Sequence, residues 1–419
     1  MRTAGNARSA LATGHKGWVG GAALLAALVL SSTDAIAQTN PYRPDPEKVK
    51  IRLGPLIVNP TITLGNIGSD ENVFNDSTDQ KRDFTMTLSP KTELWLPFLG
   101  SWFEGVVAED LNWYRRYSSE RAANTTMSLN WKLPLSRLTA DVGVNRSVTR
   151  ERPGFEIDAR ARHVQTGYEA AASFFFLPNT SIDFGARRTE TDFDENAQFQ
   201  DINLHDQLDS TSTSVMVGVS QKLTPLTTVS FGVNRRHDRF TFNPLRDSDS
   251  TDLTAAVRFD PAALLKGAVT VGYSDFEPAS NILPSFTGVT MAADLSYAPL
   301  EVTKLIFRAE RGVRYSYDVT EPYYLQTGFN AEVTQQVFGP VDLIARGGTA
   351  SLDYRHRADL LALVVAHSDR VSSYGGGVGY HVGRSVRIGF NIDQVHRNSP
   401  IESRRYDRLT YGSSLTYDF

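Results

Sequence analysis

The sequence contains no cysteine among its 419 residues. This absence excludes disulfide bonds, a thiol nucleophile, cysteine-bound zinc and a lipoprotein anchor. A surplus of one charge is also missing, because 43 basic residues stand against 47 acidic ones and the net charge is −4. The chain therefore lacks the basic character of a nucleic-acid-binding protein, and we expect no nucleic-acid partner.

Long hydrophobic runs are missing after residue 37, so the sequence predicts no membrane helix. The first 37 residues have the pattern of a secretory signal peptide. Arg2, Arg8 and Lys16 precede an apolar stretch at 22–30, and a small-x-small pattern predicts cleavage after Ala37. The stretch is too short for an anchor, which takes about 20 residues. Cleavage would remove three basic residues and one acidic residue, changing the net charge from −4 to −6.

The rest of the chain alternates apolar and polar residues. In its last segment, Leu415 and Tyr417 fall on one face of a strand, and Ser414 and Thr416 fall on the other. Residues 386–393 and 305–316 alternate in the same way, except that Arg311 falls among the apolar residues and is expected near a rim or at a register shift. Since a charge at the lipid midplane costs about 2–4 kcal/mol, the polar face is expected to line a lumen.

Two kinds of connection separate these segments. Short ones, marked by proline or glycine, lie at 96–100, 133–136, 177–180, 224–226, 260–267, 298–300, 338–340 and 382–383. Long polar ones include 70–82, 150–160, 192–206, 243–252, 275–284, 356–370 and 398–405. Short turns on one rim and long loops on the other are typical of outer-membrane barrels, whose short turns face the periplasm.

The predicted fold is therefore all-β, a transmembrane antiparallel up-and-down β-barrel of about 18 strands (16–18) in the cell outer membrane. We expect residues 1–37 to be the signal peptide, 38–52 a periplasmic N-terminal segment, and 53–419 the barrel. A soluble secreted β-sandwich or propeller is the alternative. That fold needs neither membrane-spanning strands of about 9–11 residues nor two classes of connection.

Short motifs in the N-terminal part carry a family resemblance. They are Pro44-Asp45-Pro46, Arg52-Leu53-Gly54, an apolar run ending at Pro60, and Asp70-Glu71-Asn72-Val73-Phe74, with Ser69 where a tyrosine often stands. This part resembles the outer-membrane β-barrel porins of alphaproteobacteria, whose genes often lie near surface-polysaccharide genes. The resemblance implies that Phe419 is the signal read by the barrel assembly machinery, and that polysaccharide-export components are possible partners.

Candidate functional residues are the charged side chains on predicted inward faces. They are Asp141, Asp183, Arg187, Arg236, Arg308, Glu310, Arg314, Arg387, Asp393 and Arg408. Rings of charge set selectivity in pores, whereas mixed charges can also pair and seal a lumen. The first hypothesis is a porin-like channel for small polar solutes or an export pore linked to surface polysaccharide. The others are a non-conducting structural or adhesive barrel and an outer-membrane hydrolase.

Enzyme and metal sites find little support in the sequence. His237 and Asp238 are the strongest hydrolase pair, but alternation places them on opposite faces, where a base cannot reach its partner. The remaining histidines show no i,i+2 or i,i+4 pair for a metal, so we expect no catalytic residue, cofactor or metal ligand. Outer-membrane lipids and lipopolysaccharide are expected partners, and the lipopolysaccharide phosphates could pair with Arg115, Arg116, Arg121, Arg150 and Arg152.

Overall fold

The computed structural model describes residues 51–418, apart from 262, 301, 361–366 and 384. The predicted signal peptide with Ala37, most of the predicted periplasmic segment, and Phe419 lie outside the described residues. Among the described residues, no helix is long and apolar enough to cross a membrane. The first strand, β1 (Ile51–Leu53), forms a hairpin with the strand that follows it.

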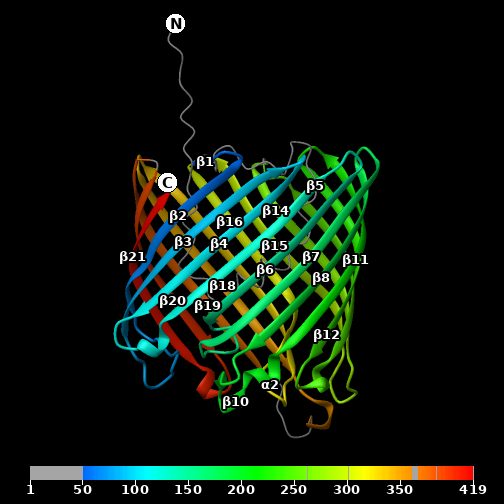
Figure 1. Ribbon diagram of the computed structural model, residues 1–419. Helices are drawn as coiled ribbons and strands as arrows, with labels where there is room; N and C mark the ends of the chain where they lie inside the picture. Colours follow the sequence, from blue (N-terminus) through cyan, green and yellow to red (C-terminus); the bar gives the residue numbers. More distant parts are fainter. Residues whose placement is uncertain (1–50, 262, 301, 361–366, 384, 419) are drawn as a thin grey trace.

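Eighteen long antiparallel strands form a closed barrel in the described part of the chain (Figure 1). They are β2 (Leu56–Asp70), β3 (Asp83–Phe98), β4 (Ser101–Tyr114), β5 (Ala122–Pro134), β6 (Leu138–Glu151), β7 (Ala161–Leu177), β8 (Thr180–Phe193), β11 (Ser210–Thr224), β12 (Thr227–Phe240), β13 (Ser248–Phe259), β14 (Leu265–Pro278), β15 (Phe286–Leu300), β16 (Thr303–Tyr315), β17 (Tyr323–Phe338), β18 (Val341–Arg355), β19 (Ser368–Val382), β20 (Val386–Asn398) and β21 (Tyr406–Asp418). Each pairs with its neighbours in sequence, and β2 also pairs with β21. The predicted fold and strand number are confirmed.

Small elements occupy the rim that carries the long loops. They are β9 (Gln198–Phe199), β10 (Ile202–Asn203), α2 (Leu204–Leu208) and the 3-10 turns η3 (Ser118–Glu120), η4 (Pro244–Arg246), η5 (Ala358–Leu360) and η6 (Glu402–Arg404). The opposite rim carries the short turns, together with β1 (Figure 1). In the turn between β3 and β4, Leu99 and Gly100 have φ of 47° and 82°. Positive φ at both central residues matches the twist of the flanking strands.

The seam between β2 and β21 contains an irregularity. The register shifts between Leu64 and Ile67 on β2, and Asn66 adopts a φ of 52°. A Cβ atom at Gly68 would lie 2.0 Å from the backbone oxygen of Tyr411 on β21, so glycine is required there. This bulge lets the first and last strands approach closely and complete the ladder.

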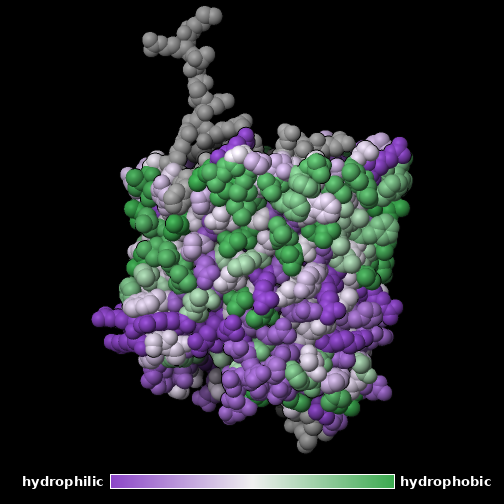
Figure 2. All heavy atoms as spheres, viewed as in Figure 1, coloured by the Kyte–Doolittle hydropathy of each residue, from purple (hydrophilic) through white to green (hydrophobic). Residues whose placement is uncertain are grey.

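Side chains alternate between the two sides of the wall. On β11, Val215, Val217 and Val219 are exposed on the outer face, while Met216 and Gly218 between them lie on the inner face. Figure 2 shows that apolar residues gather over the half of the outer surface nearer the short turns, and polar ones over the other half. Arg311 lies on the outer side of β16, four residues before its end, where it donates hydrogen bonds to the Val289 carbonyl oxygen and the Thr327 hydroxyl.

Several predicted loops prove too long. Residues 248–252, 275–278 and 368–370 were expected in loops, but they form the outer ends of β13, β14 and β19. The wall strands have 12–17 residues, whereas a tilted strand crosses the hydrocarbon in about 9–11. The extra residues lie beyond the apolar band, where both faces can be polar because water reaches them. A prediction from polar composition alone therefore assigned these strand ends to loops.

Candidate functional site

The barrel encloses a cavity of about 1520 Å³ that is lined by side chains from all 18 wall strands. All ten charged candidates from the sequence line this cavity: Asp141, Asp183, Arg187, Arg236, Arg308, Glu310, Arg314, Arg387, Asp393 and Arg408. They are spread around the wall instead of forming one compact cluster, because they come from six different strands.

Most of these charges are paired. Ion pairs join Arg187 to Glu169 (2.8 Å), Arg236 to Asp238 (3.2 Å), Arg308 to Asp294 (3.2 Å), Arg314 to Glu310 (3.0 Å), Arg346 to Asp393 (2.5 Å), Arg387 to Asp342 (2.6 Å) and Arg408 to Asp70 (2.6 Å). Asp183 accepts hydrogen bonds from Ser181 and Ser220. Opposite charges this close cancel over short distances, so the field of these pairs in the lumen is weak.

The loop between β6 and β7, residues 152–160, folds into the lumen, and we call it the inward loop. Its residues 152–158 and 160 are part of the cavity lining. Phe155 packs against an apolar cluster on the inner wall: Tyr324, Ala350, Leu352, Tyr354, Val371, Val395 and Tyr406. These apolar side chains break the polar pattern of the inner face, and the inward loop covers them, which removes apolar surface from water.

Arg397 on β20 anchors the inward loop. Its side chain is fully buried, and Nη1 donates to the carbonyl oxygens of Phe155 (2.9 Å) and Glu156 (3.2 Å). The same nitrogen lies 2.7 Å from Asp158 Oδ2, and Nη2 lies 2.7 Å from Asp369 Oδ2. One guanidinium therefore ties the loop to β20 and, through Asp369, to β19. Charge-assisted hydrogen bonds of this kind are the strong ones.

The ends of the inward loop are held by two further arginines. Arg152 donates to the carbonyl oxygens of Asp158 and Val73, each at 2.7 Å. Arg160 donates to the Tyr114 hydroxyl at 2.6 Å and pairs with Glu120. Arg152 had been expected to reach lipopolysaccharide, but it lines the lumen. The polar loop composition gave no sign that this loop turns inward.

The far side of the inward loop contacts the loop between β16 and β17. Glu156 accepts hydrogen bonds from the Ser316 hydroxyl (2.6 Å) and the Tyr317 amide (3.3 Å). Arg246 donates to the carbonyl oxygens of Tyr317 and Asp318 and so holds the second loop in place. Burial raises the pKa of the Glu156 carboxyl to about 7, although Ser316 and Arg404 act in the opposite direction.

Docking of the inward loop is therefore expected to weaken as pH rises. The pKa of Glu156 is about 7 in the docked loop, above its ordinary value of 4.5, so protonation of Glu156 favours docking. This contribution to the free energy of docking is complete below about pH 4.5 and is lost as pH rises through about 7. The loss is on the order of 3 kcal/mol. Chymotryptic cleavage after Phe155, normalised to a reference peptide, should accelerate between pH 5.5 and pH 8.5. Glu156→Gln should remove this pH dependence, and an unchanged dependence in that variant would exclude Glu156 as its origin.

The proposed hydrolase pair is not formed. Asp238 is buried on the lumen side and accepts a hydrogen bond from the Tyr315 hydroxyl at 2.7 Å. Its neighbour His237 lies on the other side of the strand, where Nδ1 is 2.8 Å from Asp249 Oδ1. The pairing of His237 with Asp249 was not predicted from the sequence, because it depends on the register between β12 and β13.

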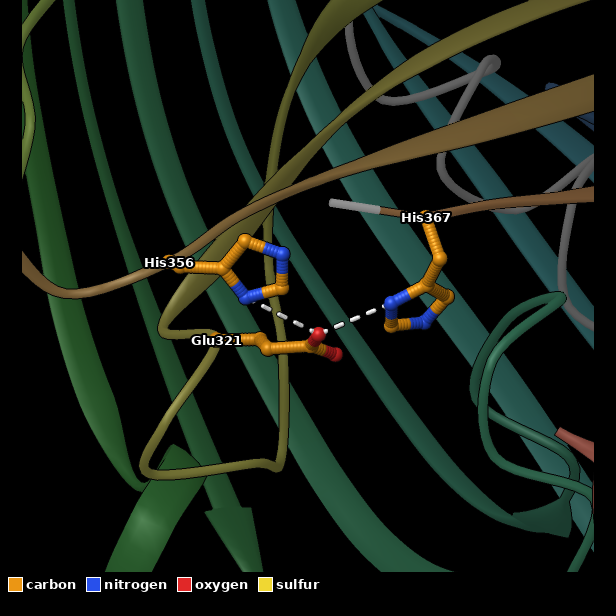
Figure 3. Close-up of side chains that lie close together, drawn as sticks. All are labelled: Glu321, His356 and His367. Carbon is orange, nitrogen blue, oxygen red and sulfur yellow. Dashed lines mark ion pairs between the residues drawn. The ribbon is translucent and has the colours of Figure 1, made fainter. Parts of the chain in front are cut away.

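One further group escaped the sequence search for metal ligands. Glu321 lies next to His356 and His367, and the three offer donor atoms within 4.8 Å of one another (Figure 3). They are 35 and 11 residues apart in the sequence and belong to two loops. A search for histidines at i,i+2 or i,i+4 could not find them.

A closed antiparallel barrel with an apolar outer face and a polar lumen defines a porin-type β-barrel protein. The chain belongs to the family described as Putative beta-barrel porin 2, whose profile matches residues 43–419. This confirms the resemblance to β-barrel porins in the sequence. No curated protein sequence matches the chain.

Three solved structures of other proteins are among those similar to this chain. The BenF-like porin from Pseudomonas fluorescens Pf-5 is 11% identical with a TM-score of 0.48, covering 87% of this chain and 98% of that one. OccK2 (OpdF) of Pseudomonas aeruginosa is 10% identical with a TM-score of 0.46, covering 86% and 98%. OpdK of Pseudomonas aeruginosa is 9% identical with a TM-score of 0.44, again covering 86% and 98%.

Proposed function

We propose that the protein is an outer-membrane channel for small polar solutes, with its path narrowed by the inward loop. The observation that carries this proposal is the cavity lined from all 18 strands, enclosed by a wall whose outer surface is apolar over the half nearer the short turns. A barrel of this size normally encloses an aqueous channel unless a loop obstructs it. Outer-membrane lipids and lipopolysaccharide would surround the wall, and the barrel assembly machinery would insert it.

Passage of a long polysaccharide is less well supported than passage of small solutes. Contacts of the inward loop reach Arg397 on β20 and Ser316 beyond β16, so they extend far around the wall from β6 and β7. A polymer would have to displace these contacts, whereas a small solute could pass beside them. A plugged barrel is the competing structural role, and transport measurements separate it from the channel. In the described part of the chain, no group of lumen residues favours a hydrolase over a channel.

Solute uptake into proteoliposomes tests the channel. We expect liposomes containing the protein to swell in arabinose faster than in a trisaccharide, because the inward loop narrows the path. The ratio of potassium to chloride permeability should stay within about threefold of one, since the lumen charges are paired. Protein-free liposomes are the control. Absence of swelling with every solute would count against a channel, and strong selectivity for one ion would contradict the account of paired charges.

A further inference from the structure

Three buried side chains converge between two long loops, and we call them the loop triad. Glu321 comes from the loop between β16 and β17, while His356 and His367 stand near the two ends of the loop between β18 and β19. Their side chains are 4%, 3% and 9% exposed. Figure 3 shows both imidazole rings turned toward the carboxylate.

The distances within the loop triad suit a shared ion. Glu321 Oε1 lies 3.1 Å from His356 Nδ1 and 3.0 Å from His367 Nδ1. Donor atoms bound tetrahedrally at about 2.0–2.1 Å from one metal are about 3.3 Å apart. The two distances from the carboxylate oxygen are thus close to the edge of a coordination tetrahedron, and all three donors lie within 4.8 Å of one another.

Hydrogen bonding leaves part of the loop triad unsatisfied. His356 is 5% exposed, yet neither of its ring nitrogens has a hydrogen-bond partner in the structure. Glu321 Oε2 also lacks one. A buried polar group left unpaired costs about 1–3 kcal/mol, so such groups call for a physical explanation. An ion bound between the donors would give one ring nitrogen of His356 a partner and would add a partner for the Glu321 carboxylate.

We propose that Glu321, His356 and His367 bind a divalent transition metal, with Zn²⁺ as the best match. Imidazole nitrogen suits zinc, copper, iron and nickel, whereas calcium and magnesium prefer oxygen donors only. Two nitrogens and one carboxylate oxygen leave a fourth position for water in a four-coordinate site. Its ligands are not among the lining residues of the cavity, so a passing solute would not contact the metal directly.

Arg404 opposes metal binding at this site. Its Nη1 lies 3.3 Å from His367 Nε2 and 3.8 Å from Glu321 Oε2. Since a guanidinium only donates, His367 Nε2 accepts there and its proton sits on Nδ1 without the metal. When a metal binds His367 Nδ1, the proton must move to Nε2. Nε2 can then no longer accept a hydrogen bond from Arg404, so Nη1 must turn away. The Tyr317 hydroxyl and Asp318, 3.2 and 3.7 Å from Nη2, already hold the other end of the guanidinium.

A metal here would brace the surface against which the inward loop docks. Glu321 belongs to the same loop as Ser316 and Tyr317, which contact Glu156. His356 and His367 belong to a different loop. The ion would cross-link the β16–β17 loop and the β18–β19 loop, and so limit the separation of the two loops. Because Glu321 follows Tyr317 by only four residues, tension on the metal would be transmitted directly to the docking contacts.

Zinc titration of the purified, detergent-folded barrel tests the proposal. After chelator treatment, the protein competes with a chromophoric chelator for Zn²⁺. We expect one tightly bound ion, and Glu321→Gln, His356→Ala and His367→Ala should each weaken binding at least about 100-fold, since even loss of a ligand's hydrogen-bond partner costs about 10–100-fold. The double variant His237→Asn/His396→Asn, which removes two exposed histidine–aspartate pairs, should bind like wild type.

Two further readouts separate lost ligands from lost folding. Each variant must keep the heat-modifiable gel mobility of a closed barrel, and Co²⁺ should give the visible absorption of a four-coordinate site in wild type only. Absence of stoichiometric zinc binding by wild type would overturn the proposal. Wild-type affinity in all three folded triad variants, or loss of binding in the His237/His396 control, would overturn it equally.

Discussion

Substituting arginine for Phe390 is expected to destabilise the folded barrel by about 2–4 kcal/mol, because the new charge would face lipid. Phe390 lies on β20 with Ile388 and Ile392, and all three are exposed on the apolar outer side of the wall. In the ladder, Phe390 stands opposite Ser413 on one side and Val378 on the other. The measurement is urea-induced unfolding in lipid vesicles, read by heat-modifiable gel mobility.

The neighbouring residue provides the matched control. Asn391 lines the cavity, so an arginine there would extend into water, and we expect a change well below that at Phe390. Its side chain already leans across Gly377, whose missing Cβ leaves room for it. A larger loss at Asn391 than at Phe390 would mean that the inner and outer faces of β20 have been exchanged.

Replacing Arg397 with methionine is expected to release the inward loop. The variant removes four hydrogen bonds and leaves Asp369, which is fully buried, without its cation. Removing one partner of a buried ion pair costs about 3–5 kcal/mol. The strand ladder is held independently of this pair, so loop undocking should relieve the cost before the barrel unfolds. Faster protease cleavage within residues 152–160, at unchanged gel mobility, would report the release.

Two variants control for nonspecific effects at Arg397. Arg357→Met removes an arginine whose pair with Asp359 lies in a solvent-accessible loop, where ion pairs contribute little to stability, so the inward loop should stay docked. Asp369→Asn in the Arg397→Met background removes the unpaired charge and should restore part of the docking. Equal cleavage rates in wild type and Arg397→Met would show that Arg397 does not hold the loop.

The barrel was predictable because its signal is local. Alternation of side chains has a period of two residues, so Leu415 and Tyr417 fall on the outer face whatever the rest of the chain does. Turns such as Leu99-Gly100 are likewise set by a few residues. The strand number follows from counting these connections. The ten charged candidates line the cavity for the same reason.

The contacts that shape the lumen were not predictable, because they join distant parts of the chain. Arg397 and Glu156 are separated by 241 residues, and nothing in the composition of residues 150–160 distinguishes an inward loop from an exposed one. Ion partners such as Asp342 depend on inter-strand register. The loop triad requires two loops to fold together. Each of these features follows from tertiary structure and carries no periodic pattern.

Single-channel recording in planar bilayers tests the central claim, that this barrel conducts and that the inward loop narrows its path. Wild type should give discrete conductance steps, and Arg397→Met should give larger ones, while Arg357→Met should match wild type. Silence in wild type with conduction in Arg397→Met would instead identify a plugged barrel. Absence of steps from both proteins in their folded form, or identical steps from both, would contradict the claim.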